Sequence, residues 1–216
     1  MKHFCLISFI LLPWFLFAQN TSGAITFVET VKLDIELPDA DEEMLKMIPK
    51  EQSVTKVLFF NSDAALYTLK DETANNDLDI SSSSDGNEFR FEIKQPKNIL
   101  YTDLDKETTI NLREFFGRDF LITGDATVHQ WKLTGEKRRI GEFECQKAVL
   151  IDTAQVVAAW FTPQIPVQAG PAGYGMLPGM ILEMDFDEGT RTIMVTDLEI
   201  RPVTKDEIAK PSKGKK

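Results

Sequence analysis

The sequence predicts a mainly β protein: a single antiparallel, strongly curved sheet or open half-barrel with a short covering helix. Two observations lead to this prediction. Short segments with apolar residues at alternate positions recur along the chain, and turn residues separate them about every eight to twelve residues. Strands that alternate with long helical segments are absent, which counts against a doubly wound α/β fold.

The first elements follow from apolar periodicity and from proline. Apolar residues alternate with polar ones through much of Gly23 to Glu36, which predicts a long half-buried strand that Pro38 ends. Asp39 can then cap a short helix over Asp39–Ile48, with Glu42 three residues later in its first turn. We expect the apolar side of this helix to cover the open face of the sheet. The same apolar side would also suit a partner protein.

The rest of the chain is typical of strands joined by short turns. One hairpin is expected to turn at Asn61-Ser62-Asp63 and another at Asp187-Glu188-Gly189-Thr190, where glycine suits a positive φ. We assign all strands to one domain over residues 19–203 and expect a disordered polar tail over 204–216. The strands expected after the first are Ser53–Asn61, Ala64–Leu69, Phe89–Ile93, Asn98–Asp103, Thr108–Phe115, Asp119–Thr123, Glu142–Ile151, Val156–Phe161, Met180–Phe186 and Arg191–Ile200.

Residues 1–18 are typical of a secretory signal peptide. Lys2 gives a positive start, an apolar segment runs from Phe4 to Phe17, and Ala18 is a small residue suited to cleavage. The apolar segment is shorter than the roughly 20 residues that span a bilayer, which argues against an uncleaved anchor. No cysteine follows it where a lipoprotein would be lipidated. We therefore expect a soluble exported protein, periplasmic or secreted, that is neither membrane-spanning nor a lipoprotein.

The charge of the chain limits its partners. The sequence has 34 Asp and Glu against 24 Lys and Arg, a formal net charge of −10. This acidity argues against nucleic acids and anionic membrane surfaces as partners, because both carry negative charge. Charge does not indicate a positive partner, and the sequence leaves the oligomeric state open.

The connection between the apolar segments Val156–Phe161 and Met180–Phe186 is the most distinctive part of the chain. It holds four prolines and four glycines between Pro163 and Gly179, so its backbone is stiff at some positions and sharply bent at others. It is either a covered crossover that closes one end of the core or a binding loop on a rigid scaffold. The residues of the candidate binding loop are Trp160, Phe161, Pro166, Gly170, Pro171, Tyr174, Gly175, Met176, Leu177, Pro178 and Gly179.

The residue types that carry most catalytic chemistry are scarce. His129 and Cys145 are the only histidine and cysteine after the signal peptide, and they lie in separate segments. The sequence has no GxSxG motif and no glycine loop of the phosphate-binding type. We predict no catalytic residues, no metal site and no cofactor, and we expect Cys145 to be a buried thiol. A carboxylate pair for hydrolysis and a Cu(I) contact through Met176 stay open as alternatives.

Three segments carry a family resemblance: WKLTGEKRRIGEFECQKA (Trp131–Ala148), AWFTPQIPV (Ala159–Val167) and GPAGYGMLPGMILE (Gly170–Glu183). They resemble the GLPGLI family of exported Gram-negative bacterial proteins. The family signature stands here as MLPGMI, with Met176 where glycine is usual and Met180 where leucine is common. The resemblance implies an exported β-rich protein and no established activity.

These observations predict a non-enzymatic envelope protein that binds an apolar small molecule, a lipid or a protein partner. The expected half-barrel is similar to that of lipoprotein carriers, by analogy of strand order and not by motif, and fold analogy alone does not establish function. One alternative is a structural accessory of an outer-membrane system without a ligand cavity. Another is a carboxylate-dependent hydrolase.

Overall fold

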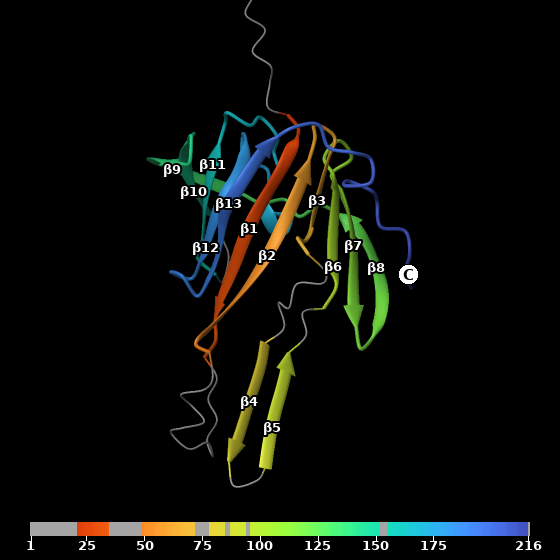
Figure 1. Ribbon diagram of the computed structural model, residues 1–216. Coiled ribbons are helices and arrows are strands. Elements are labelled where there is room, and N and C mark those ends of the chain that lie inside the picture. The colour runs from red at the N-terminus through yellow and green to blue at the C-terminus, as the bar shows by residue number, and fades with distance from the viewer. Residues whose placement is uncertain are drawn as a thin grey trace, which may run out of the picture.

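One large antiparallel sheet dominates the computed structural model, which describes residues 21–34, 49–71, 78–84, 87–93, 96–151 and 155–215. Among these residues, eleven strands form the sheet in the spatial order β8-β7-β6-β3-β2-β1-β13-β12-β11-β10-β9 (Figure 1). The strands are β1 (Gly23–Lys32), β2 (Glu51–Phe60), β3 (Ala64–Leu69), β6 (Asn98–Asp103), β7 (Thr108–Phe115), β8 (Arg118–Asp125), β9 (Trp131–Ile140), β10 (Phe143–Leu150), β11 (Val157–Thr162), β12 (Met180–Phe186) and β13 (Arg191–Ile200).

A separate hairpin lies beyond one end of this sheet. It consists of β4 (Leu78–Ser84) and β5 (Asn87–Ile93), which pair only with each other among the described strands. Figure 1 shows it extending away from the main sheet, on the side where β1 ends and β2 begins.

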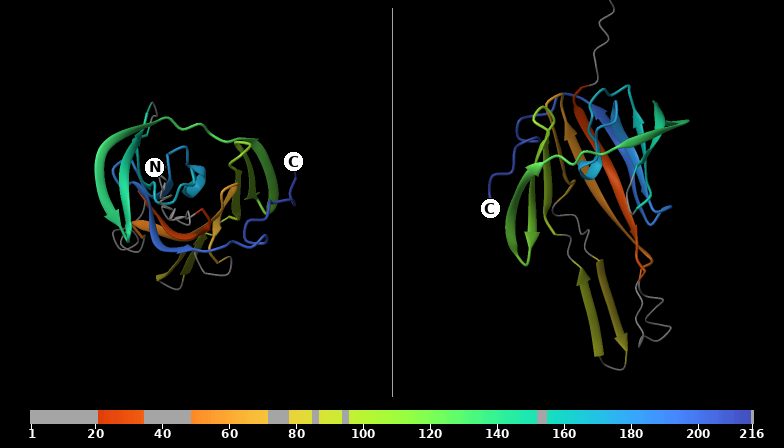
Figure 2. Two further views of the ribbon diagram at one scale, coloured as in Figure 1. Left: turned by 90° about the horizontal axis from the view of Figure 1, so that it is seen from above. Right: turned by 180° about the vertical axis from the view of Figure 1, so that it is seen from behind.

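The main sheet is open, with β8 and β9 as its two edges. Seen from above, it bends into a curve, and the connection between β11 and β12 lies inside that curve (Figure 2). The prediction of a mainly β, antiparallel sheet that does not close into a barrel is confirmed. The first and last long strands, β1 and β13, pair with each other near the middle of the sheet.

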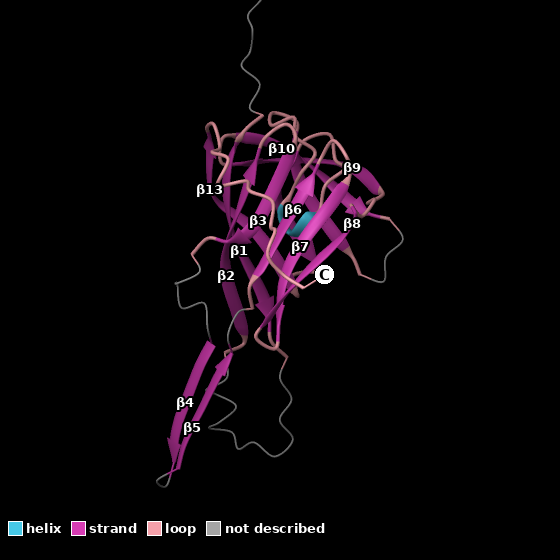
Figure 3. Ribbon diagram, turned by 90° about the vertical axis from the view of Figure 1, so that its right-hand side faces the viewer, coloured by secondary structure: helices cyan, strands magenta, loops and turns pink. Residues whose placement is uncertain are grey.

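The structure gives no support for the short covering helix. The predicted helix Asp39–Ile48 falls within residues 35–48, which lie outside the described residues. In the described part of the chain the helical element is the single turn η1 (Pro171–Gly173), shown in Figure 3. Side chains of the β11–β12 connection cover the concave face instead, because this connection carries its own apolar residues into the core. None of the described helices has the length and hydrophobicity that crossing a membrane would need.

The concave face of the sheet carries the main core. In β1 and β2, alternate side chains such as Ile25, Phe27, Leu58 and Phe60 are buried on this face, as the period of two in a strand requires. Strands β11, β12 and β13, in the other half of the sheet, add further buried apolar residues to this core. These are Val157, Ala159, Phe161, Met180, Ile181, Leu182, Met184, Phe186 and Ile193.

Residues of the C-terminal segment, where composition predicted a disordered polar tail, pack on the opposite face of β3 and β6. Residues 204–215 are described, and Ile208 packs against the smaller cluster of Ala64, Leu66 and Tyr101. The Lys215 backbone forms a bridge with Phe120 of edge strand β8. Composition predicted disorder because this segment is polar, but one of its cations forms an ion pair with a carboxylate elsewhere in the fold. Lys210 pairs with Asp103 at 3.1 Å, over a sequence separation that composition does not encode.

Candidate functional site

The connection between β11 and β12, residues 163–179, fills part of the concave face, and we call it the plug loop. Figure 2 shows it inside the curve of the sheet. Its apolar side chains belong to the main core, and four are almost fully buried: Ile165, Val167, Ala169 and Leu177. Backbone hydrogen bonds from Met180 N to Ile165 O (3.0 Å) and from Ile181 N to Ala169 O (3.0 Å) fix it to the start of β12. The plug loop is therefore a structural part of the core.

Glycine is required where the plug loop approaches the sheet. A Cβ atom added at Gly170 would lie 2.7 Å from Ile181 Cβ. A Cβ atom at Gly175 would lie 2.6 Å from Gln168 O within the loop itself. Both distances are far below van der Waals contact, so the glycines allow the loop to reach its depth in the concave face.

Met176 adopts a backbone conformation that suits glycine. Its φ is 67°, in the left-handed region, where an L-residue is strained by about 1 kcal/mol or more. We expect Met176→Gly to raise the free energy of unfolding by about 1 kcal/mol, measured by urea denaturation. Met194→Gly is the control, because Met194 is a half-exposed strand residue without a positive φ, and it should lower stability. A Met176→Gly protein that unfolds at lower urea than wild type would contradict the strain argument.

Four aromatic rings hold the middle of the plug loop. Trp131 Nε1 donates a hydrogen bond of 2.8 Å to Gly175 O. The Tyr174 ring lies 4.7 Å from the His129 ring and 5.6 Å from the Phe186 ring, measured between centroids. Burial lowers the pKa of His129 below its ordinary value, so its ring is neutral near pH 7. The loop is thus fixed to the start of β9 and to the residues just before it, as well as to β12.

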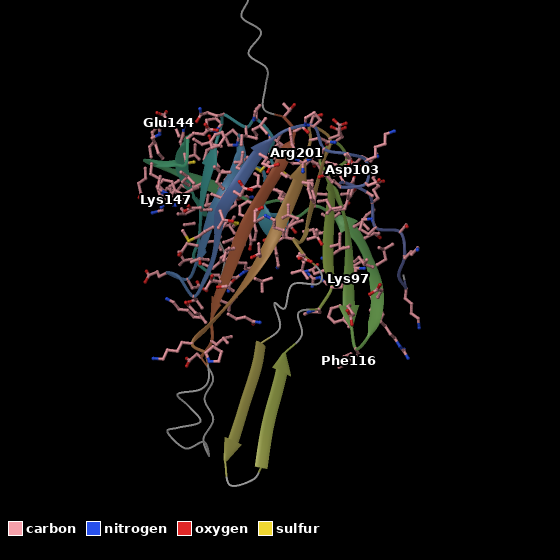
Figure 4. The ribbon with its side chains drawn as sticks, in the orientation of Figure 1. Lys97, Asp103, Phe116, Glu144, Lys147 and Arg201 are labelled. Carbon is pink, nitrogen blue, oxygen red and sulfur yellow. The ribbon has the colours of Figure 1, made fainter. Side chains whose placement is uncertain are left out.

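A groove of about 320 Å³ lies between the plug loop and the β6–β7 end of the sheet. Tyr174, Met176 and Val167 contribute from the loop, and exposed carboxylates at Asp105 and Glu107 lie on the opposite side. Figure 4 shows Asp103, which also lines the groove, at one end of β6, with Lys97 at the other end. The remaining lining residues are Ser62, Ala65, Thr102, Leu104, Ala126, Thr127, Pro166, Gln168, Ala169, Gly170, Gly173 and Gly175.

The structure divides the candidate loop residues into four groups. Those that line the groove are Pro166, Gly170, Tyr174, Gly175 and Met176. Those that are buried without lining it are Phe161, Pro171, Leu177 and Gly179, whereas Pro178 is exposed. Trp160 is half-buried on β11, where the Arg138 guanidinium lies 4.1 Å from its ring centroid and Arg138 also pairs with Glu183.

A cluster of charged residues on the concave face is absent from the sequence predictions. The Glu29 carboxylate of β1 accepts two hydrogen bonds. Lys56 Nζ donates to Oε2 at 2.7 Å, and Arg191 Nε donates to Oε1 at 2.8 Å. We call Glu29, Lys56 and Arg191, with the neighbouring Tyr67, the inner charge cluster. Lys56 lies 5.4 Å from the Tyr67 ring centroid, and Tyr67 packs edge-on against Phe27.

The sequence does carry a signal for this cluster. Glu29 continues the inward series Ile25, Phe27, Glu29, and Lys56 lies between Val54 and Leu58 in a similar series. A charge at a core position of a period-two pattern is unexpected unless it is paired. The pairing between β1 and β2, however, follows only from tertiary register.

The burial of Cys145 is confirmed, and its surroundings favour an unreactive thiol. It is free and 1% exposed. Burial, together with the charge of Glu183, raises its pKa to about 11, so the thiolate is scarce near pH 7. Within the described residues, no group of three or more His, Cys, Asp or Glu side chains is placed to hold a metal ion.

Comparison with known proteins supports the fold and leaves the activity open. Residues 151–183 match a family model described as "Protein of unknown function (Porph_ging)", over β11, the plug loop and the start of β12. The fold is similar to PNGF-II, solved in space groups P21 and C2. The P21 structure has a TM-score of 0.58 at 14% identity and covers 87% of this chain. The C2 structure has a TM-score of 0.57 at 14% identity and covers 88% of this chain.

This likeness is one of fold alone, because the identity is low. The chain spans 30% of the length of PNGF-II in both matches, so most of that protein has no counterpart in the compared region. A comparison with curated proteins found no match.

Proposed function

We propose that this is an exported, non-enzymatic binding protein whose groove beside the plug loop holds a small amphipathic molecule. The groove itself supports the proposal, since its volume of about 320 Å³ exceeds the roughly 300 Å³ at which ligand pockets begin. Tyr174 and Met176 offer an apolar surface on one side, and Asp105 and Glu107 offer polar groups on the other. Such a lining suits a ligand with both an apolar and a polar part better than an entirely apolar lipid.

The structural-accessory function remains a second candidate, because the plug loop leaves little of the main core open. Ile165 and Leu177 are buried where an apolar carrier would need space for its ligand. The tip of the β7–β8 hairpin also presents exposed aromatic side chains, Phe115 and Phe116, and Figure 4 labels Phe116 at this tip. An exposed apolar tip is a feature through which an envelope protein could dock.

Hydrolysis by paired carboxylates gains no support from Glu29 and Asp103, two largely buried carboxylates among the described residues. Glu29 pairs with Lys56 and Arg191, and Asp103 pairs with Lys106 and Lys210. Cations surround each of these carboxylates and favour its ionised form. A glycosidase-type general acid needs the opposite, an apolar pocket or a neighbouring carboxylate that raises its pKa.

We also propose that the chain is a GLPGLI-type protein. The signature has glycine at the position of Met176, where the φ of 67° suits glycine. It retains glycine at Gly179, where a Cβ atom would lie 2.1 Å from Thr162 O. The signature residues therefore coincide with backbone positions that the plug loop constrains.

Native mass spectrometry tests the binding function. The purified protein is examined before and after organic extraction and is then challenged with oleate and with lysophosphatidylcholine. We expect at least one stoichiometric adduct, and we expect Thr127→Trp to abolish it, because Thr127 is an exposed groove residue whose replacement by a large ring would fill the groove.

Thr123→Trp is the matched control, because Thr123 is exposed on β8 and does not line the groove. It should retain the adduct. A protein that carries no ligand on purification and takes up neither amphiphile would contradict the binding function and favour the structural one.

A further inference from the structure

The inner charge cluster has an excess of positive charge. Among the described residues, its two cations, Lys56 and Arg191, share the single carboxylate of Glu29. The side chains are 18%, 31% and 11% exposed, respectively, so water screens this excess only partly. A partly buried, uncompensated cation is costly, and an anion that reaches it is bound favourably.

Unpartnered polar atoms surround the cluster on the same face. Among the described residues, five buried side-chain polar atoms lack a hydrogen-bond partner. Four of them belong to residues that the strand register places on the concave face with Lys56 and Leu58: Gln52, Tyr67, Asn98 and Asn111. Unsatisfied buried polar groups are rare in proteins, and their concentration on one face indicates a ligand that would satisfy them.

Tyr67 is the most informative of the four. It is only 5% exposed, and in the described part of the chain its hydroxyl makes no hydrogen bond of normal geometry, although it lies close enough to the Glu29 carboxylate to interact with it. Burial, with a further contribution from the charge of Glu29, raises the pKa of Tyr67 above its ordinary value, so the phenol keeps its proton. It therefore offers an O–H donor next to two cations.

We propose that the concave face at the inner charge cluster is a second binding site, which holds a small organic carboxylate through Arg191, Lys56 and the Tyr67 hydroxyl. Two cations against one carboxylate leave one positive charge, which matches a monoanion better than a dianionic phosphate. The two oxygens of a carboxylate can accept hydrogen bonds from the Arg191 guanidinium, the Lys56 ammonium and the Tyr67 hydroxyl at the same time. The amides of Asn98 and Asn111 would receive polar substituents of the ligand.

This second site is distinct from the groove beside the plug loop. Phe186 of β12 lies between the two sites. One side of it contacts Tyr174, which lines the groove, and the Arg191 guanidinium lies 4.6 Å from its ring centroid. None of Lys56, Tyr67 and Arg191 lines the groove. Loss of binding at one site can therefore be separated from loss of binding at the other.

Isothermal titration calorimetry of the purified protein with sodium hexanoate tests the second site. 1-Hexanol is the uncharged comparison ligand, and inorganic phosphate is the comparison anion. We expect hexanoate to bind at least about tenfold more tightly than hexanol, the difference that one charge-assisted interaction supplies. Tyr67→Phe should weaken hexanoate binding about tenfold and leave the fold intact, because the ring stays in its edge contact with Phe27.

Two further variants complete the test. Glu29→Gln should strengthen hexanoate binding, because it releases a second cation. Tyr101→Phe should leave hexanoate binding unchanged, since Tyr101 packs in the cluster beneath Ile208 on the opposite face. Equal affinity for hexanoate and hexanol, unchanged affinity in Tyr67→Phe, or tighter binding of phosphate than of hexanoate would each overturn the carboxylate site.

Discussion

Replacement of Gly179 by alanine is expected to lower the free energy of unfolding by about 3 kcal/mol, the upper end of what overpacking costs. Gly179 has a φ of 148°, which residues with a side chain rarely adopt. Its added Cβ atom would lie 2.1 Å from Thr162 O. Thr162 cannot move away easily, because it is fully buried and its Oγ1 donates a 2.9 Å hydrogen bond to Glu144 O.

Urea denaturation followed by tryptophan fluorescence measures this loss. Gly124→Ala is the matched control, because a Cβ atom at Gly124 would have open space around it and Gly124 has no positive φ. The control should stay within about 0.5 kcal/mol of wild type. If Gly179→Ala were as stable as the control, the close contact between the end of the plug loop and β11 would be wrong.

Replacement of Glu29 by glutamine is expected to cost about 2 kcal/mol at pH 7. Removing one partner of a fully buried ion pair costs about 3–5 kcal/mol, and the partial exposure of Lys56 and Arg191 reduces that figure. The variant keeps the shape of the side chain but leaves two cations without their carboxylate. Urea denaturation at pH 7 measures the difference.

The ion pairs of Glu29 with Lys56 and Arg191 also make the stability of the protein depend on pH. Burial alone would raise the pKa of Glu29, but Lys56 and Arg191 outweigh it and hold the pKa below its ordinary value of 4.5. The carboxylate therefore contributes its full stabilisation above pH 4.5, and the contribution is lost as the pH falls through the lower pKa of the folded state. The stability difference between wild type and Glu29→Gln should shrink over that acidic range.

Glu136→Gln is the control for this prediction, because Glu136 pairs with Lys147 at an exposed position on β9. Its unfolding midpoint at pH 7 should match wild type, as expected for a surface ion pair. A Glu29→Gln protein with wild-type stability at pH 7 would show that the inner charge cluster contributes nothing to the fold.

Local sequence was sufficient for the class of the fold and for most strands. Alternation in β1 and β2 predicted half-buried strands, because side chains of a strand point to alternate faces. The turn at Asn61 was also predictable, and the Asn61 Oδ1 atom accepts hydrogen bonds from the backbone of Asp63 and Ala64. These features depend on residues a few positions apart, so the pattern contains the necessary information.

The candidate site depended on contacts that the pattern does not contain. The sequence identified the plug loop through its prolines and glycines but left two interpretations open, a covered crossover and a binding loop. The structure shows that Ile165 and Leu177 enter the core while Tyr174 and Met176 line a groove. This division follows from how deeply the loop enters the curved sheet, which is set by distant strands.

The inner charge cluster and the C-terminal segment show the same limit. Glu29 meets Arg191 because β1 pairs with β13, over a separation of 162 residues. Lys210 meets Asp103 because the last segment folds back over β6. A charge at a core position can be recognised in the sequence, but its partner is chosen by strand pairing, since only the assembled sheet brings residues from the two ends of the chain into contact.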